Sequence, residues 1–180
     1  MIDRTWTLFL DRDGIVNERI VGGYVKDFNQ FVLKNDFLEA MPKLNSLFGK
    51  VIIVTNQQGV GKGLVSLNEV NMIHDSLLKE LSLKSISIDK IYVCPHLAQM
   101  HCNCRKPEIG MGSLAQKDFP DISFSKSVMI GDSLSDLIFG KRLKMKTVYI
   151  PESNTAIPTE VFDYADYICN NLVDFYKLIE

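Results

Sequence analysis

The sequence predicts an α/β fold, a Rossmann-like three-layer arrangement around a mostly parallel sheet. Short apolar runs alternate along the chain with stretches of helical periodicity, which is typical of strands joined by crossover helices. Five apolar runs predict buried strands, at residues 7–10, 51–54, 88–93, 127–130 and 147–150. Polar residues follow directly on the first, second and fourth runs. Because right-handed crossovers place these three strand ends at one edge of the sheet, we expect a ligand site there.

Helices are expected between these strands. Apolar residues recur at helical spacing within residues 37–48, 70–81 and 172–179. Pro42 predicts a kink or an irregular first turn in the first helix. Residues 66–69 form a capping box before the second helix, in which we expect His74 to be an exposed polar residue, and Ser133 with Asp136 can cap the helix after the fourth strand. The three glycines in residues 57–63 match no nucleotide-binding fingerprint and predict a flexible active-site loop.

Length and composition favour one globular domain spanning residues 1–180. Hydrophobic residues make up 46% of the chain and charged residues 23%, and the net charge is −2. The absence of a basic run predicts no nucleic-acid partner. No apolar stretch reaches the roughly 20 residues that span a bilayer, and Asp3 and Asp11 flank the first apolar run, unlike in a signal peptide. We therefore expect a cytoplasmic protein without a membrane partner. The lack of an obvious coiled-coil pattern or exposed apolar stripe predicts a monomer.

The first predicted strand ends at two carboxylates one residue apart, Asp11 and Asp13, followed by a glycine. Two such groups at a strand end are costly unless a cation compensates them, although Asp and Gly are also common in plain solvated turns. Asp11 and Asp132 offer the hard oxygen ligands that Mg²⁺ prefers. Together with the Thr55 hydroxyl and the Lys106 ammonium, these groups indicate a phosphate ligand.

A phosphate beside a nucleophilic aspartate needs positive charge between the two groups. A unit negative charge about 4 Å from a carboxylate costs about 4 kcal/mol at an effective dielectric of 20, which is roughly a thousandfold in binding. Mg²⁺ and Lys106 would supply the positive charge and would also stabilise the transition state. Of the two carboxylates Asp11 and Asp13, one can then attack phosphorus while the other protonates the leaving oxygen and later activates water.

Three of the four cysteines lie between Cys94 and Cys104. In a reducing compartment such a cluster indicates a metal site rather than a disulfide framework. Two half-sites can close a tetrahedral Zn²⁺ site of structural type, and their ligands would be Cys94, His96, Cys102 and Cys104. His101 is an alternative fourth ligand, and free or redox-active thiols are the alternative to zinc. Zinc bound to Cys104 would also fix the backbone that positions Lys106. The fourth cysteine, Cys169, is expected to be a small core residue.

Four short motifs follow one another in the chain: Asp11-Arg12-Asp13-Gly14, Val54-Thr55-Asn56, Lys106-Pro107, and Gly131-Asp132 with Asp136. Together they resemble the haloacid dehalogenase (HAD) superfamily of phosphohydrolases. The resemblance covers residues 8–150 and implies a HAD-like fold without a cap domain. The cysteine cluster that runs into Arg105-Lys106-Pro107 narrows the resemblance to a zinc-containing branch. That branch holds D-glycero-D-manno-heptose 1,7-bisphosphate 7-phosphatases and histidinol-phosphate phosphatases.

The resemblance implies a role for each matching residue. Asp11 would be the nucleophile that forms an aspartyl-phosphate, and Asp13 would be the general acid and base. Thr55 and Lys106 would hold the transferring phosphoryl group. Mg²⁺ would be bound by Asp11, Asp132 and the main-chain carbonyl of Asp13. The residues in contact with substrate would be Asn56, Gln57 and Arg105, and zinc would be bound by Cys94, His96, Cys102 and Cys104.

Heptose bisphosphate is the expected substrate, because Gly23-Tyr24-Val25 and residues 57–63 resemble the heptose group. The short zinc loop keeps histidinol phosphate as the alternative. A phosphoryl-accepting signalling domain of the receiver type also combines acidic residues, Thr and Lys on a parallel sheet. Asp13 disfavours this alternative, because a general acid beside the nucleophile would speed loss of the phosphoryl group, and a signal must persist. A catalytically dead, zinc-stapled binding module is disfavoured because every expected catalytic group is present. The sequence thus predicts Mg²⁺-dependent hydrolysis of a small phosphorylated metabolite.

Overall fold

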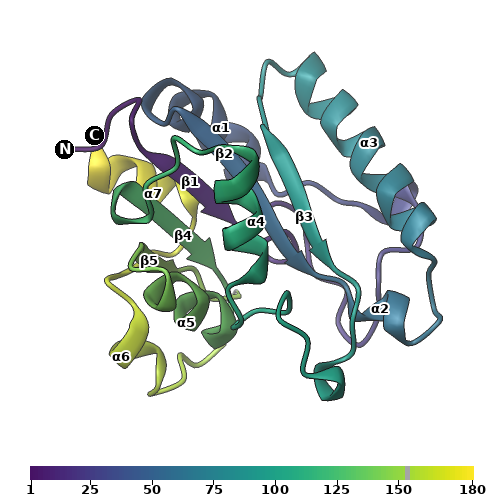
Figure 1. Cartoon of the computed structure of the whole chain (residues 1–180). Helices are drawn as coiled ribbons and strands as arrows, with labels where there is room; N and C mark the ends of the chain where they lie inside the picture. The colour runs from purple at the N-terminus through teal and green to yellow at the C-terminus, as the bar shows by residue number, and fades with distance from the viewer. Residues whose placement is uncertain (153–154) are drawn as a thin grey trace.

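The computed structural model describes residues 1–152 and 155–180, and its core is a six-stranded parallel sheet (Figure 1). The strands are β1 (Thr7–Leu10), β2 (Lys50–Asn56), β3 (Lys90–Cys94), β4 (Ser127–Gly131), β5 (Lys146–Tyr149) and β6 (Tyr167–Ile168). The helices are α1 (Asn35–Leu47), α2 (Gln58–Gly61), α3 (Leu67–Leu83), α4 (Gly110–Asp118), α5 (Leu134–Arg142), α6 (Val161–Tyr164) and α7 (Leu172–Ile179), with 3₁₀ turns at Phe28–Gln30, Ala98–Met100 and Phe124–Lys126.

The sheet order is β3-β2-β1-β4-β5-β6, and each neighbouring pair is parallel. The five predicted strands are all present, which confirms the α/β architecture, and β6 adds a sixth that the sequence pattern missed. From β1 the chain moves outward to β3 and then returns to the other side of β1 as β4. This reversal makes the carboxyl end of β1 a topological switch point, the usual place for a ligand in an open parallel sheet.

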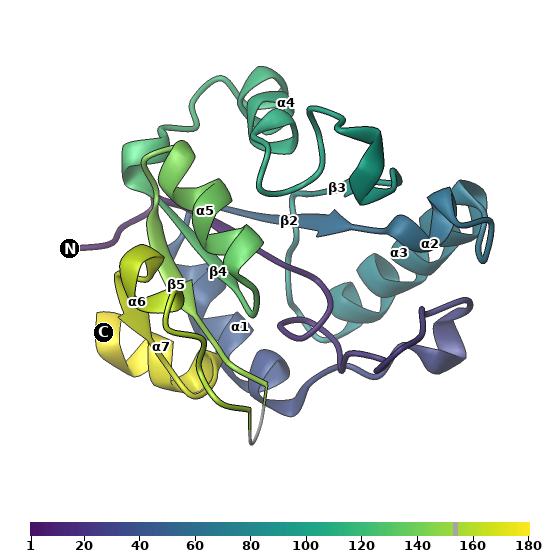
Figure 2. The ribbon, with the colours of Figure 1, turned by 90° about the horizontal axis from the view of Figure 1, so that it is seen from below.

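The sheet separates two apolar layers because its central strands are buried on both faces. Leu8 and Leu10 of β1 pack with residues of α1, α3 and α7, whereas Phe9 between them packs with residues of α4 and α5. Figure 2 shows α4 and α5 on one side of the sheet and α1, α3 and α7 on the other. Cys169 lies in the first of these layers, 8% exposed, as predicted.

Residues 57–63 differ from the expected loop, because their middle part forms the helical turn α2. Gly61 donates its N–H to the Pro95 carbonyl at 2.9 Å, and a Cβ at Gly61 would lie 3.0 Å from that oxygen. A Cβ at Gly59 would lie 3.0 Å from the ring of Tyr24. The glycines therefore permit close packing of this segment against its neighbours. Pro42, where a kink or an irregular first turn was expected, lies inside α1, and the helix continues past it to Leu47.

Within the described part of the chain, none of the helices combines the length and apolarity that a transmembrane span requires.

Candidate active site and metal centres

The polar residues that follow β1, β2 and β4 meet at one edge of the sheet, as the topology predicts. Asp11 follows β1 directly, and its N–H donates to the Ile130 carbonyl of β4 at 2.9 Å. Thr55 lies at the end of β2, and Asp132 follows β4. Thr55, Asp11 and Asp132 are each less than 9% exposed, so the sheet places polar groups in a region from which water is largely excluded.

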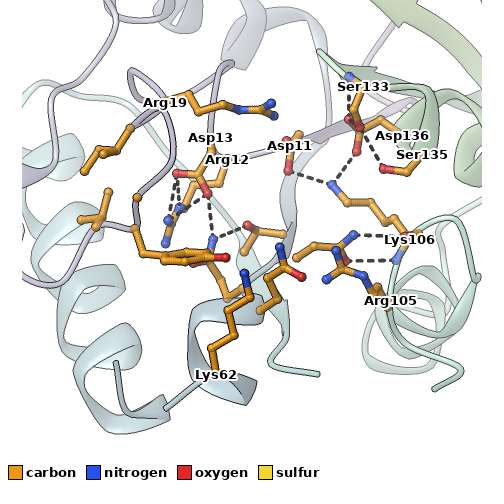
Figure 3. Close-up of a pocket in the computed structure, with 18 of the residues that line it drawn as sticks. Asp11, Arg12, Asp13, Arg19, Lys62, Arg105, Lys106, Ser133, Ser135 and Asp136 are labelled. Carbon is orange, nitrogen blue, oxygen red and sulfur yellow. Dashed lines mark hydrogen bonds and ion pairs between the residues drawn. The ribbon is translucent and has the colours of Figure 1, made fainter. Parts of the chain in front are cut away.

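Lys106 is the buried cation at the centre of this cluster (Figure 3). Its Nζ lies 2.7 Å from Asp11 Oδ1 and 2.6 Å from Asp136 Oδ1, and it donates to the Val54 carbonyl at 2.6 Å. Burial lowers the pKa of Lys106, but the charges of Asp11 and Asp136 outweigh burial and raise it, so the ammonium stays charged. The side-chain amide of Asn56 accepts a hydrogen bond from the Lys106 backbone N–H at 3.0 Å and donates one to the Lys106 carbonyl at 3.1 Å. Asn56, a predicted substrate contact, therefore holds the segment that carries Lys106.

Asp136 contributes more than the predicted helix cap. Its Oδ2 accepts hydrogen bonds from the Ser133 N–H and hydroxyl at 3.1 and 2.6 Å, so the two residues cap the start of α5 as expected. Its Oδ1 contacts Lys106. A Cβ at Gly131 would lie 2.3 to 2.4 Å from Asp136 atoms, so glycine is required for this close approach. The spacing of Gly131, Asp132 and Asp136 in the sequence was the available signal for this role.

Three carboxylates of this cluster fit a divalent cation. Asp11, Asp132 and Asp136 each place an oxygen within 4.8 Å of the others. Burial, with the charges of Asp136 and Asp13, raises the pKa of Asp11 to about 6. Burial, with the charges of Asp11 and Asp136, raises the pKa of Asp132 to about 8. Asp132 Oδ2 is buried and has no hydrogen-bond partner among the described residues, and such hard oxygens suit Mg²⁺.

Arg19 reaches this cluster from the segment after β1, and the sequence patterns gave no signal for it. Its Nη2 donates to Asp132 Oδ1 at 2.8 Å, and its Nε lies 3.3 Å from Glu152 Oε1. The Arg19 side chain is 41% exposed, so it covers Asp132 from the solvent side. Only the folded chain brings a residue of this segment to the end of β4.

The Asp13 carboxylate is held by a second set of donors, on the other side of Asp11 from Lys106 (Figure 3). Arg12 Nη2 donates to both of its oxygens at 2.9 and 3.0 Å, Asn17 Nδ2 to Oδ1 at 3.0 Å, and Gln57 Nε2 to Oδ2 at 2.8 Å. Burial raises the pKa of Asp13, but the charge of Arg12 and these hydrogen bonds outweigh it and lower the pKa below its ordinary value. Gln57 also donates to Thr55 Oγ1 at 2.8 Å, so this predicted substrate contact links two predicted catalytic residues.

Asp11, Asp13, Thr55 and Lys106 line one cavity of about 540 Å³. Besides Lys106, Arg12 and Arg19, its lining includes Lys62, which is exposed, and Arg105, which is half-buried. The Lys62 ammonium lies 5.4 Å from the centre of the Tyr24 ring, and Arg105 Nη1 donates to the His96 carbonyl at 3.4 Å. Among the described residues neither cation forms an ion pair with a carboxylate. The cavity thus offers positive charge both at its floor and at its mouth.

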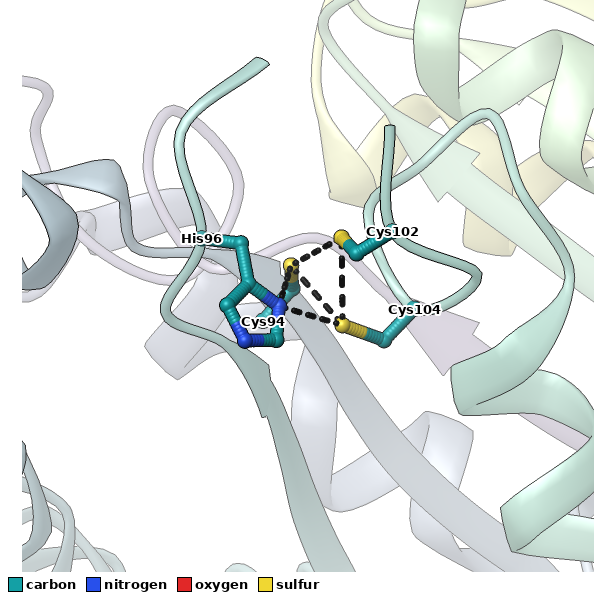
Figure 4. Close-up of side chains that lie close together, drawn as sticks. All are labelled: Cys94, His96, Cys102 and Cys104. Carbon is teal, nitrogen blue, oxygen red and sulfur yellow. Dashed lines mark hydrogen bonds between the residues drawn. The ribbon is translucent and has the colours of Figure 1, made fainter. Parts of the chain in front are cut away.

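The four predicted zinc ligands lie together beside this cavity (Figure 4). Cys104 Sγ lies 3.1 Å from Cys94 Sγ, 3.5 Å from Cys102 Sγ and 3.2 Å from His96 Nδ1. Cys94 Sγ lies 3.6 Å from Cys102 Sγ and 3.8 Å from His96 Nδ1. Zn–S bonds of about 2.3 Å in a tetrahedral site require S···S separations near 3.8 Å, so the cluster has the size and donor set of a closed metal site. None of the four cysteines forms a disulfide, and His101 lies outside the cluster.

The chain is similar to known phosphatases along most of its length. A family model described as polynucleotide kinase 3 phosphatase matches residues 10–154. A D-glycero-alpha-D-manno-heptose-1,7-bisphosphate 7-phosphatase of Mycobacterium bovis is 42% identical over 132 residues, covering 73% of this chain and 70% of that protein. A D-glycero-beta-D-manno-heptose-1,7-bisphosphate 7-phosphatase of Pasteurella multocida is 31% identical over 179 residues and covers 96% of both chains.

The fold is shared with solved phosphatase structures. The D,D-heptose 1,7-bisphosphate phosphatase of B. bronchiseptica, complexed with magnesium and phosphate, superimposes with a TM-score of 0.82, at 25% identity and 97% coverage of both chains. A structure from Mesorhizobium loti, described as that of a HAD-like phosphatase, shares the fold with a TM-score of 0.79 at 24% identity, and covers 99% of this chain and 87% of that chain. The chain therefore belongs to the HAD superfamily of phosphatases, in the family described as polynucleotide kinase 3 phosphatase.

Proposed function

We propose that this phosphatase hydrolyses the 7-phosphate of D-glycero-D-manno-heptose 1,7-bisphosphate in a magnesium-dependent reaction through an aspartyl-phosphate on Asp11. One observation carries the proposal. Asp11 is buried in the lining of the cavity, with Lys106 Nζ at 2.7 Å from its Oδ1 and an oxygen of Asp132 and of Asp136 within 4.8 Å. This combination of nucleophile, ammonium and hard oxygen ligands suits a phosphate dianion that must approach a carboxylate.

The side chains divide the work of phosphoryl transfer. Lys106 occupies Asp11 Oδ1, which leaves the other carboxylate oxygen to attack phosphorus. Thr55 and Lys106 hold the oxygens of the transferring group. The minor protonated form of Asp13 gives its proton to the leaving oxygen, and the resulting carboxylate then takes one from the water that hydrolyses the aspartyl-phosphate. Mg²⁺ bound by Asp11, Asp132 and the main-chain carbonyl of Asp13 would neutralise the charge of phosphate and nucleophile.

The cations at the mouth of the cavity support a substrate with a second phosphate. Lys62 and Arg105 lack carboxylate partners among the described residues, so either can pair with an anion outside the reacting centre. Histidinol phosphate carries an ammonium and no second phosphate, and these cations would repel that ammonium. The names of the relatives also favour heptose bisphosphate, and they include both anomers.

Zinc in the Cys94 cluster completes the proposal. The thiolates of Cys94, Cys102 and Cys104 with His96 would leave no open coordination position, so the metal would be structural. Arg105 and Lys106 follow Cys104 directly. A fixed Cys104 therefore restrains the segment that places Lys106 against Asp11. We further propose that residues 1–180 act as one phosphatase domain, because the catalytic and zinc residues all lie on the same sheet edge.

A comparison of kcat/KM tests the substrate. The purified protein would be assayed with both anomers of heptose 1,7-bisphosphate and with histidinol phosphate, with and without Mg²⁺. We expect at least a hundredfold preference for one or both heptose substrates. A preference for histidinol phosphate would overturn the substrate, and full turnover by Asp11→Asn with circular dichroism unchanged would overturn the nucleophile.

A further inference from the structure

Arg12 is a buried cation beside the cavity, although it lies in the middle of the Asp11-Arg12-Asp13 motif. Its side chain is 1% exposed. A buried guanidinium must be paired and hydrogen-bonded, because leaving water is otherwise costly. Asp13 is the charged partner, with Nη2 at 2.9 and 3.0 Å from its two oxygens and Nε at 3.3 Å from Oδ1. The ring of Phe31 covers the guanidinium carbon at 5.5 Å.

His74 supplies the remaining partner of this guanidinium. Arg12 Nη1 lies 3.0 Å from His74 Nε2, across 62 positions of sequence. The guanidinium has only donors, so Nε2 must be the acceptor and the imidazole must be neutral. The side chain belongs to α3 and is 5% exposed, so the expectation of an exposed polar residue was wrong. Its place in the helical stripe of Val70 and Leu77 turns it into the protein.

The contact with His74 fixes how Arg12 meets Asp13. With Nη1 directed at α3, the Nη2 and Nε edge of the planar guanidinium faces the carboxylate. Asn17 and Gln57 then hold the same carboxylate from two further sides. Without an acceptor at His74, the buried Nη1 would lose its partner, and the guanidinium would have to turn toward another acceptor.

We propose that His74 is a positioning residue for proton transfer in this enzyme: it orients Arg12, and Arg12 orients the Asp13 carboxylate toward the leaving oxygen. The inference rests on the proposed role of Asp13 as general acid. His74 itself lines neither the cavity nor the carboxylate cluster. A general acid contributes about 10²- to 10⁴-fold, and this contribution is lost in part when its geometry is disturbed.

The dependence on leaving group separates positioning from a merely structural role. A primary alkyl phosphate needs a proton at its leaving oxygen, whereas the p-nitrophenolate of p-nitrophenyl phosphate leaves without one. The kcat/KM value reports the steps up to phosphoryl transfer to Asp11. For His74→Leu we expect a tenfold or larger loss of kcat/KM with the alkyl phosphate and less than a threefold loss with p-nitrophenyl phosphate. His74→Gln, which restores an acceptor near Nε2, should stay within about threefold of wild type on both.

Two controls assign each outcome. Leu77→Ala, in the same buried stripe of α3, should lower thermal stability and leave the ratio of the two kcat/KM values unchanged. Asp13→Asn should show the leaving-group effect in full, and if it does not, the proposed role of Asp13 fails rather than that of His74. With Asp13→Asn as expected, equal losses on both substrates in His74→Leu would overturn the inference. Should His74→Leu not fold, His74→Asn, whose acceptor is too short to reach Arg12, takes its place with the same expected ratio.

Discussion

Lowering the pH from 7.5 to 5.0 should cost the folded protein about 2 kcal/mol of unfolding free energy through His74 alone. Burial and the charge of Arg12 lower the pKa of His74 to about 3, with Asp13 opposing them, whereas the ordinary value is 6.5. Between these values the unfolded chain binds a proton that the folded chain does not. The contribution of His74 is therefore complete above pH 6.5 and is lost as the pH falls toward 3.

Urea unfolding at the two pH values, followed by fluorescence, measures this effect. Trp6 is the only tryptophan of the chain and packs against the core, so it reports on unfolding. His74→Gln keeps an acceptor for Arg12 but does not titrate. All other groups titrate alike in both proteins, so the difference in unfolding free energy between them isolates His74. It should shift by about 2 kcal/mol between pH 7.5 and 5.0, and an unchanged difference would refute a neutral, buried His74.

Three further predictions concern the metal sites. Gly14→Ala should abolish Mg²⁺ binding measured by calorimetry, because Gly14 has φ +95° and a Cβ there would lie 1.9 Å from Asp132 Oδ2. The control is Gly22→Ala, which should retain Mg²⁺ binding, because Gly22 also has a positive φ, +69°, but a Cβ there would meet open space. Metal analysis of Cys102→Ala should find no bound zinc, and its melting temperature should be lower than that of the wild type by about 5 °C or more. A wild-type protein that is as heat-stable without zinc as with it would contradict the structural role of the metal. Arg19→Gln should tighten Mg²⁺ binding about two- to fivefold, because the change removes a half-exposed cation from beside Asp132. Weaker Mg²⁺ binding by this variant would show that Arg19 instead orients the Asp132 carboxylate.

Much of the architecture could be predicted because central parallel strands are buried on both faces and appear as unbroken apolar runs. This holds for β1, β2 and β4, whose ends also carry the motif residues. β6 has two residues, both exposed, and no such run marks it. Residues 57–63 were misread as a loop because glycine permits close packing as readily as flexibility, and only the neighbouring Tyr24 and Pro95 decide between the two.

The sites divide in the same way. Spacing in the sequence was enough to bring together the four cysteine and histidine ligands, because a short loop allows few other arrangements. Asp136 was predicted as a cap and is also the second anionic partner of Lys106. Arg19 left no pattern at all. His74 did leave one, since it shares a helical stripe with Val70 and Leu77, but its polarity favoured an exposed position.

The sequence by itself determined which reactive groups this protein has and that they gather at one edge of a parallel sheet. Residue spacing and the apolar runs of buried strands are properties of short segments, so they can be recognised without knowing the contacts between distant segments. Only the tertiary structure decided which atom faces which: Lys106 on Asp11 and Asp136, Arg19 on Asp132, and His74 behind Arg12 and Asp13. These pairings join residues up to 113 positions apart, and their charges and hydrogen bonds act over a few ångströms that no local pattern records.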